Sequence, residues 1–268
     1  MEPFSDFEGR LAVVTGAGSG IGRELVAALA GAGAHVAACD IRKQAVTITA
    51  REVGRRFPDV LVTAHACDVA DPDSVAAFRD EVVDQHDAVG VHVLVNNAAV
   101  VGGASFVAGN PTEWERTFDV AWTGTYQCTR AFLPLMMKAE RGVLVNVASV
   151  NALWASVGPG SPHTAYSTAK FAVRGFTESL IADFAKNAPH LSAVLVVPGR
   201  VRTAMPTPPP SWRRALNSLV ADVGPMSASD AAAEIMTGLG RGTWRIVIGE
   251  DARRIDDRVR SDPDSAYD

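Results

Sequence analysis

Two side chains with complementary acid–base chemistry, Tyr166 and Lys170, stand four residues apart. They open an amphipathic stretch that runs to Asn187, and residues at i and i+4 of a helix share one face. A unit positive charge about 4 Å from a phenol, at an effective dielectric near 20, contributes about 4 kcal/mol, which equals roughly three pKa units. The spacing therefore predicts that Lys170 lowers the pKa of Tyr166 towards 7, where a general acid/base works best. An isolated pair of this kind more often lies on a solvated helix face, so the surrounding sequence must show whether the pair is catalytic.

A third polar group, the hydroxyl of Ser149, follows an apolar run that begins at Gly142. If this run is a parallel strand, the serine lies at the carboxyl edge of the sheet, where open α/β folds bind their ligands. The sequence therefore predicts that Ser149, Tyr166 and Lys170 form one catalytic group.

A glycine-rich turn lies near the N-terminus, at Thr15–Gly22, and reads TGAGSGIG. It follows the apolar run Leu11–Val14 and precedes a helical pattern. Glycines let the backbone turn tightly and approach a pyrophosphate, whose charge is favoured at a helix start. The spacing is T-G-x-x-x-G-x-G rather than G-x-G-x-x-G. We expect Gly16 and Gly20 to form a dinucleotide-binding turn, although such a turn can also serve as a plain strand-to-helix connection.

An acidic residue, Asp40, closes the next apolar run, 18 positions beyond the last glycine of that turn. A carboxylate about 20 residues downstream typically accepts hydrogen bonds from the adenosine ribose, which favours NAD over NADP. Two alternatives stay open: Asp40 is only a helix cap, or Arg23 or Arg42 binds a 2′-phosphate. Asp68, at the end of the third run, is a candidate for the adenine edge or a turn former.

Seven short apolar runs alternate with longer helical patterns along the chain. Continuous apolar runs indicate strands of a parallel sheet that is covered on both faces, and regular alternation with helices gives a doubly wound fold. We expect an α/β fold: a single-domain, Rossmann-like, doubly wound parallel sheet of about seven strands, spanning 1–268. The predicted strands are Leu11–Thr15, His35–Asp40, Val60–Ala66, Val91–Val95, Gly142–Ala148, Ser192–Val197 and Trp244–Ile248.

One segment, between Pro198 and Asp230, breaks this pattern because it is too proline-rich for a helix or a central strand. Long connections inside compact domains are often binding loops. We expect a substrate lid at 199–229, with a plain surface loop as the alternative.

The bulk composition limits the classes of binding partner that we expect. With a net charge of −5 over 268 residues, nothing points to nucleic acid or an anionic membrane. The three cysteines form no CxxC pair, which disfavours a disulfide framework, and no apolar run approaches the ~20 residues of a membrane helix. We expect a cytoplasmic protein that binds a small-molecule substrate and no metal.

From Phe7 to about Ile248 the chain resembles the short-chain dehydrogenase/reductase family. The resemblance rests on the glycine turn, Ser149, the Tyr166/Lys170 pair, and two further motifs: Asn96-Asn97-Ala98-Ala99 and Pro198-Gly199-Arg200-Val201-Arg202-Thr203. It implies that Tyr166 is the acid/base, that Ser149 steadies the substrate oxygen, and that Lys170 also binds the nicotinamide ribose. It further implies a homodimer or homotetramer and a cofactor cleft that Asn96 and the backbone near Ala98 help to line. It also implies that Thr203, with the turn after Pro198, holds the carboxamide of the nicotinamide. With the residues inferred above, the full predicted cofactor-binding set is Gly16, Ser19, Gly20, Ile21, Asp40, Asp68, Val69, Asn96, Ala98, Tyr166, Lys170, Pro198, Gly199, Val201 and Thr203.

The sequence departs from the family pattern in three places. Ala121 stands where the family usually has an asparagine that helps to hold a relay water, and Ala99 replaces a glycine. The interval from Ser149 to Tyr166 is longer than usual, with 158–162 as the expected insertion. Taken together, the sequence predicts an NAD-dependent oxidoreductase that interconverts a secondary alcohol and a ketone. A non-redox enzyme of the epimerase, dehydratase or dehalogenase type, or a cofactor-sensing protein on the same scaffold, remains the alternative.

Overall fold

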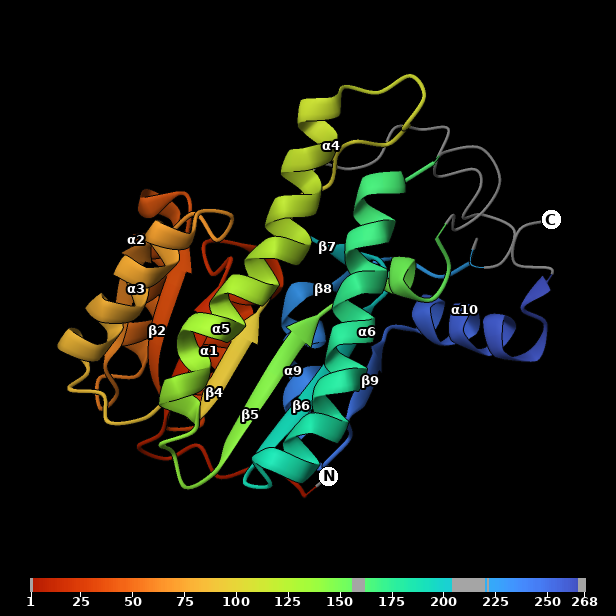
Figure 1. The fold of residues 1–268 in the computed structure, drawn as a ribbon. Coiled ribbons are helices and arrows are strands. Elements are labelled where there is room, and N and C mark those ends of the chain that lie inside the picture. The colour runs from red at the N-terminus through yellow and green to blue at the C-terminus, as the bar shows by residue number, and fades with distance from the viewer. Residues whose placement is uncertain (1, 156–161, 204–219, 221, 265–268) are drawn as a thin grey trace.

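The computed structural model describes the chain except for residues 1, 156–161, 204–219, 221 and 265–268. Its centre is a seven-stranded sheet in the order β3-β2-β1-β4-β5-β6-β9, and every strand pair in it is parallel (Figure 1). The predicted fold class is therefore confirmed. The strands are β1 Leu11–Thr15, β2 His35–Asp40, β3 Val62–Ala66, β4 Val93–Asn96, β5 Gly142–Val147, β6 Leu191–Pro198 and β9 Arg245–Ile248.

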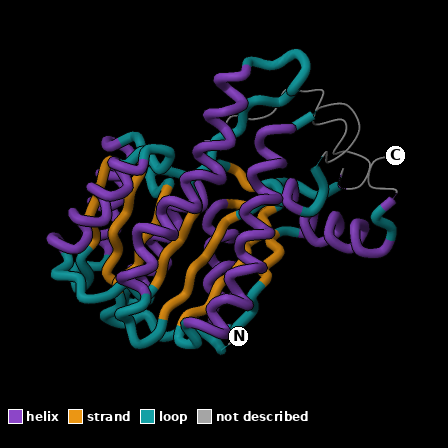
Figure 2. The backbone as a smooth tube through the Cα atoms, in the orientation of Figure 1, coloured by secondary structure: helices purple, strands orange, loops and turns teal. Residues whose placement is uncertain are grey.

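Helices cover both faces of this sheet (Figure 2). The α-helices of the described residues are α1 Gly20–Gly31, α2 Lys43–Arg56, α3 Pro72–Gln85, α4 Pro111–Phe118, α5 Gly124–Met136, α6 Thr164–Asn187, α9 Ala228–Gly240 and α10 Glu250–Ser261. Two short turns of other helical geometry lie within the described residues: the π-helical η1 at Asp119–Thr123, between α4 and α5, and the 3₁₀ turn η2 at Val150–Ala152, between β5 and α6.

The alternation of side chains along β1 explains the two layers. Ala12 and Val14 pack into one core cluster, together with residues of α1 and α9, whereas Leu11 and Val13 pack into the other, together with residues of α3, α5 and α6. Successive side chains of a strand point to opposite faces. A strand buried on both sides must therefore be apolar throughout, as the sequence of β1 is.

The structure shifts several predicted strand ends by one or two residues. The third strand begins at Val62 rather than Val60. At this end the carbonyl of Leu61 already accepts the N–H of Val36, whereas its own N–H donates to Nδ1 of the His35 ring at 2.8 Å.

Much of the predicted lid, residues 204–219 and 221, lies outside the described part of the chain. Its described ends form a short parallel pair, β7 Val201–Arg202 with β8 Met226–Ser227. Over the described part of the chain, none of the helices has the length and apolar character needed to cross a membrane.

Candidate active site

A cleft of about 530 Å³ opens at the carboxyl ends of the strands. Parallel α/β sheets bind ligands at this edge because the loops and helix starts converge there. The structure brings fifteen of the sixteen predicted site residues to its lining: Gly16, Ser19, Gly20, Ile21, Asp40, Asp68, Val69, Ala98, Ser149, Tyr166, Lys170, Pro198, Gly199, Val201 and Thr203.

The glycine turn between β1 and α1 has the backbone that its sequence requires. Gly16 has φ +64° and Gly20 has φ +58°, the left-handed region that glycine adopts at little cost. A Cβ on Gly20 would lie 2.9 Å from Cγ2 of Thr203, and one on Gly22 would collide with the carbonyl of Gly16. The first turn of α1 therefore opens directly onto the cleft, and its N–H groups fit a pyrophosphate.

Asp40 ends β2 inside this cleft and is mostly buried. Its Oδ2 accepts the N–H of Gly18 at 3.0 Å, and its Oδ1 accepts the main-chain N–H of Arg42 at 2.9 Å and, at 3.4 Å, the side-chain Nε–H. The guanidinium of Arg42 also donates to the hydroxyl of Ser19 at 3.0 Å. Asp40 thus lies in contact with Arg42, one of the two arginines that the sequence offered as alternative cofactor determinants.

The cleft also contains an ion pair that the sequence did not reveal. Arg116 of α4 donates to Oδ2 of Asp68 at 2.9 Å, while Oδ1 of the same carboxylate accepts the N–H of Ala70 at 3.0 Å. Both charged residues line the cleft. No sequence motif marks Arg116 as a site residue, because 48 residues separate it from Asp68.

The three predicted catalytic residues meet on the strand-β5 side of the cleft. Tyr166 and Lys170 lie on the first turns of α6, with Nζ of Lys170 5.5 Å from the centroid of the Tyr166 ring. The same ammonium group donates to the carbonyl of Val147 at 2.8 Å. Ser149 follows β5 and caps the η2 turn, its hydroxyl accepting the N–H of Asn151 at 3.2 Å.

The acid–base properties of this group differ from the sequence expectation. Burial raises the pKa of Tyr166 to about 12, against a smaller lowering by the Ser149 hydroxyl. Burial also lowers the pKa of Lys170 to about 7. The predicted lowering of the tyrosine pKa by Lys170 is wrong for the protein without ligand, because desolvation disfavours both charged forms and the lysine loses part of its charge.

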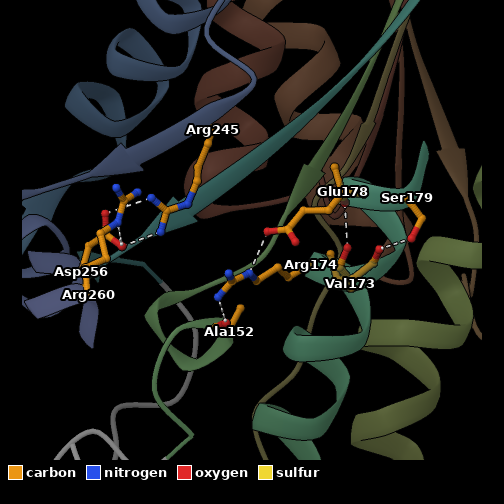
Figure 3. A network of polar contacts seen from close by, with 10 residues as sticks. Ala152, Val173, Arg174, Glu178, Ser179, Arg245, Asp256 and Arg260 are labelled. Atoms are coloured by element: carbon orange, nitrogen blue, oxygen red, sulfur yellow. Dashed lines mark hydrogen bonds and ion pairs between the residues drawn. The ribbon is translucent and has the colours of Figure 1, made fainter. Parts of the chain in front are cut away.

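The turn that carries Ser149 is fastened to α6 by side chains that sequence reasoning missed. Nδ2 of Asn151 donates to the Ser167 hydroxyl at 3.2 Å, and that hydroxyl donates to the carbonyl of Ala155 at 2.6 Å. Arg174, two turns after Tyr166, donates to the carbonyl of Ala152 at 3.2 Å (Figure 3). These bonds hold the serine turn against the helix of the tyrosine and the lysine.

Asn96 is the predicted site residue that the structure places elsewhere. Its side chain is buried under the cleft, where Nδ2 donates to Thr129 and to Oδ1 of Asn146, each at 2.9 Å. The next residue, Asn97, lines the cleft instead and donates to the carbonyls of Thr15 and Gly16. The expectation is corrected because the end of β4 places Asn96 in the core network.

Ala121, at the position where an asparagine was expected, is fully buried inside the π-helical turn η1. Its carbonyl accepts the Thr125 hydroxyl at 3.2 Å. The widened turn is therefore present without the asparagine side chain. The predicted insertion at 158–162 lies outside the described residues except for Pro162.

The fold and this cleft define a Rossmann-like, nucleotide-binding class of α/β protein, and comparisons with known proteins narrow the class. The family model described as short chain dehydrogenase matches residues 10–214. The chain belongs to the short-chain dehydrogenase/reductase family of oxidoreductases.

Two relatives illustrate the family range. A putative oxidoreductase SadH from Mycobacterium tuberculosis is 33% identical over 266 residues, covering 94% of this chain and 90% of the relative. A 2-(R)-hydroxypropyl-CoM dehydrogenase from Xanthobacter autotrophicus is 35% identical, covering 73% of this chain and 76% of the relative.

The solved structures support the fold. A short-chain dehydrogenase/reductase from Burkholderia phymatum in complex with NAD superposes with a TM-score of 0.83 at 24% identity, covering 99% of this chain and 98% of that one. An alcohol dehydrogenase from the archaeon Thermococcus sibiricus, complexed with 5-hydroxy-NADP, gives 0.69 at 23% identity, covering 87% and 91%.

Proposed function

We propose that this protein interconverts a secondary alcohol and a ketone with NAD(H) as the hydride carrier. The observation that carries the proposal is the convergence of Ser149, Tyr166 and Lys170 on the same cleft as the glycine turn and Asp40. A phenol, an ammonium group and a hydroxyl beside a dinucleotide-binding turn suit proton transfer coupled to hydride transfer.

The protein's own residues supply the proton chemistry. When bound, the nicotinamide supplies the hydride donor or acceptor. In the reductive direction Tyr166, which burial keeps as a neutral phenol, donates its proton to the developing alkoxide, and Ser149 hydrogen-bonds the same oxygen. In the oxidative direction the tyrosine acts as a base only after it has lost its own proton, and the resulting phenolate then takes the hydroxyl proton of the alcohol. Lys170, whose pKa lies at about 7, is placed to exchange a proton near neutral pH.

The cleft fits the cofactor on structural grounds. Gly16 and Gly20 leave the room that a pyrophosphate needs, and Asp40 provides a carboxylate at the end of β2 for the ribose hydroxyls. The cited solved structures contain NAD in one case and an NADP derivative in the other, so the choice of NAD rests on Asp40.

Turnover with a panel of secondary alcohols and ketones tests the proposal, using NAD(H) and NADP(H) and following nicotinamide absorbance. Tyr166→Phe should lower kcat by about 10²- to 10⁴-fold while NADH affinity stays nearly unchanged, because it removes the acid/base and no phosphate contact. A variant that keeps more than about a tenth of wild-type activity would remove Tyr166 from the mechanism.

A second function has one observation in its favour. Ala121 replaces the asparagine that the family pattern leads one to expect, which favours a cofactor-sensing protein on this scaffold. Tight NADH binding without turnover on any member of the panel would support that alternative.

A further inference from the structure

The backbone turn after β6 lies directly on a buried carboxylate of α10. Oδ2 of Asp251 accepts the main-chain N–H of Arg200 at 2.7 Å and its Nε–H at 3.4 Å, and Oδ1 accepts the N–H of Ala252 at 3.0 Å. Asp251 itself is only 3% exposed and is absent from the cleft lining.

The close approach at Gly199 shows how tightly the turn follows that carboxylate. A Cβ on this glycine would collide with Oδ1 of Asp251, and one on Gly249, which has φ +88°, would lie 2.8 Å from the same oxygen. Pro198, Gly199, Val201 and Thr203 of this stretch line the cleft. The carboxylate therefore supports the cleft wall from behind.

Arg200 extends the connection to a later part of the chain. Its guanidinium donates to the carbonyl of Val220 at 3.0 Å and also to the carbonyl of Val223. Asp251 thus holds an arginine that joins the turn after β6 to the chain leading into β8.

We propose that Asp251 is a positioning residue that holds the Pro198–Gly199 turn in the shape needed to receive the nicotinamide end of the cofactor. The inference rests on the proposed function in that NAD(H) is the ligand. A buried carboxylate is costly unless donors surround it, and here three N–H groups do. Two of the three belong to Arg200, so most of the hydrogen bonds that stabilise this carboxylate come from the turn after β6.

The same helix offers a matched control in Asp256. This carboxylate is also mostly buried and pairs with Arg245 of β9 and with Arg260 (Figure 3). Neither Asp256 nor these arginines line the cleft. Asp256→Asn therefore reports the effect of losing a buried ion pair of α10 without touching the turn after β6.

The experiment compares two ligands by calorimetry: NADH, and ADP-ribose, which lacks the nicotinamide. Asp251→Asn should weaken NADH binding about tenfold (about 1.4 kcal/mol), because the amide cannot keep charged hydrogen bonds to Arg200. ADP-ribose binding should change less than about twofold. Asp256→Asn should leave both affinities near wild type while lowering the melting temperature.

Distinct outcomes overturn distinct claims. Equal weakening of NADH and ADP-ribose by Asp251→Asn, or no weakening of either, overturns the positioning role. A wild-type protein that does not bind NADH overturns the proposed function and this inference with it. If Asp251→Asn does not fold, Arg200→Met decides: selective loss of NADH affinity of threefold or more supports the role, and a smaller or unselective loss overturns it.

Discussion

Burial and charge act against each other on the Tyr166–Lys170 pair. The local spacing places an ammonium group near a phenol, which favours the ionised tyrosine. The surrounding core removes both groups from water, which raises the pKa of the tyrosine and lowers that of the lysine. A fully covered lysine that is partly neutral near pH 7 makes the stability of the ligand-free protein depend on pH.

The lysine prediction concerns unfolding without cofactor. The unfolded chain holds the Lys170 proton up to pH 10.5, whereas the native state releases it from about pH 7, so stability should rise with pH across this window. Relative to Lys170→Met, the wild type should gain about 2 kcal/mol of unfolding free energy between pH 7.5 and 9.5.

Urea titrations at both pH values measure this gain, and Lys186→Met, at an exposed position of the same helix, is the control. Tyr166 does not interfere, because its raised pKa only matters above pH 10. Parallel pH dependence of the wild type and Lys170→Met would contradict the prediction.

Asp40 carries the prediction on cofactor choice. A carboxylate accepts hydrogen bonds from ribose hydroxyls but repels a 2′-phosphate. Asp40→Ala should weaken NAD use and improve NADP use, because Arg42, which now bonds both Asp40 and Ser19, is freed. The ratio of the two kcat/KM values should shrink at least about tenfold. If the wild type prefers NADP, or if the ratio does not change, Asp40 does not determine cofactor choice and Arg42 becomes the candidate.

At the scale of elements, one helix and one turn assemble the proposed catalytic group. Helix α6 contributes Tyr166 and Lys170, and its Ser167 and Arg174 fasten the η2 turn behind Ser149. The π-helical η1 turn packs against α6 and surrounds Ala121. Widened turns leave main-chain carbonyls without their α-helical partners, and such carbonyls can bind a relay water.

Ala121→Asn tests whether the turn or the side chain matters. A bridging water needs only two to four polar partners, so the turnover rate should change less than about tenfold. Because Ala121 is fully buried, the larger side chain should cost about 1–3 kcal/mol of stability. Ala121→Val controls for volume, and a hundredfold gain in rate with asparagine alone would show that the missing residue limits catalysis.

At the scale of the whole molecule, the sheet separates the two largest of the three core clusters in the described part of the chain. Phe132 of α5 belongs to one cluster and Ile235 of α9 to the other, and both are fully buried. Among the residues that the structure describes, no buried residue belongs to both of these clusters. Their contributions to stability should therefore be independent.

Phe132→Ala should cost about 3–5 kcal/mol and Ile235→Ala about 2–5 kcal/mol of unfolding free energy. Since the sites lie on opposite faces of the sheet, the double variant should equal the sum of the two within about 0.5 kcal/mol. Denaturant unfolding of the three variants measures this, and a larger coupling would mean that the sheet transmits strain between its faces.

Local sequence determined much of this protein. Apolar runs specify buried parallel strands because both faces of such strands are covered. The glycines at 16 and 20 specify the turn before α1, because their backbone angles exclude most side chains. The four-residue spacing of Tyr166 and Lys170 specifies one helical face. Each of these signals depends on neighbours within a few residues, so a sequence displays them directly.

Only the tertiary structure decided the rest. The pKa of Tyr166 depends on what covers it, and covering comes from elements distant in the chain. Three contacts of the site join residues 33 to 52 positions apart. They are the hydrogen bond of the buried Asn96 to Thr129, the ion pair of Arg116 with Asp68, and the close approach of Gly199 to Asp251. Desolvation and such long-range contacts are set by packing, and no local pattern encodes them.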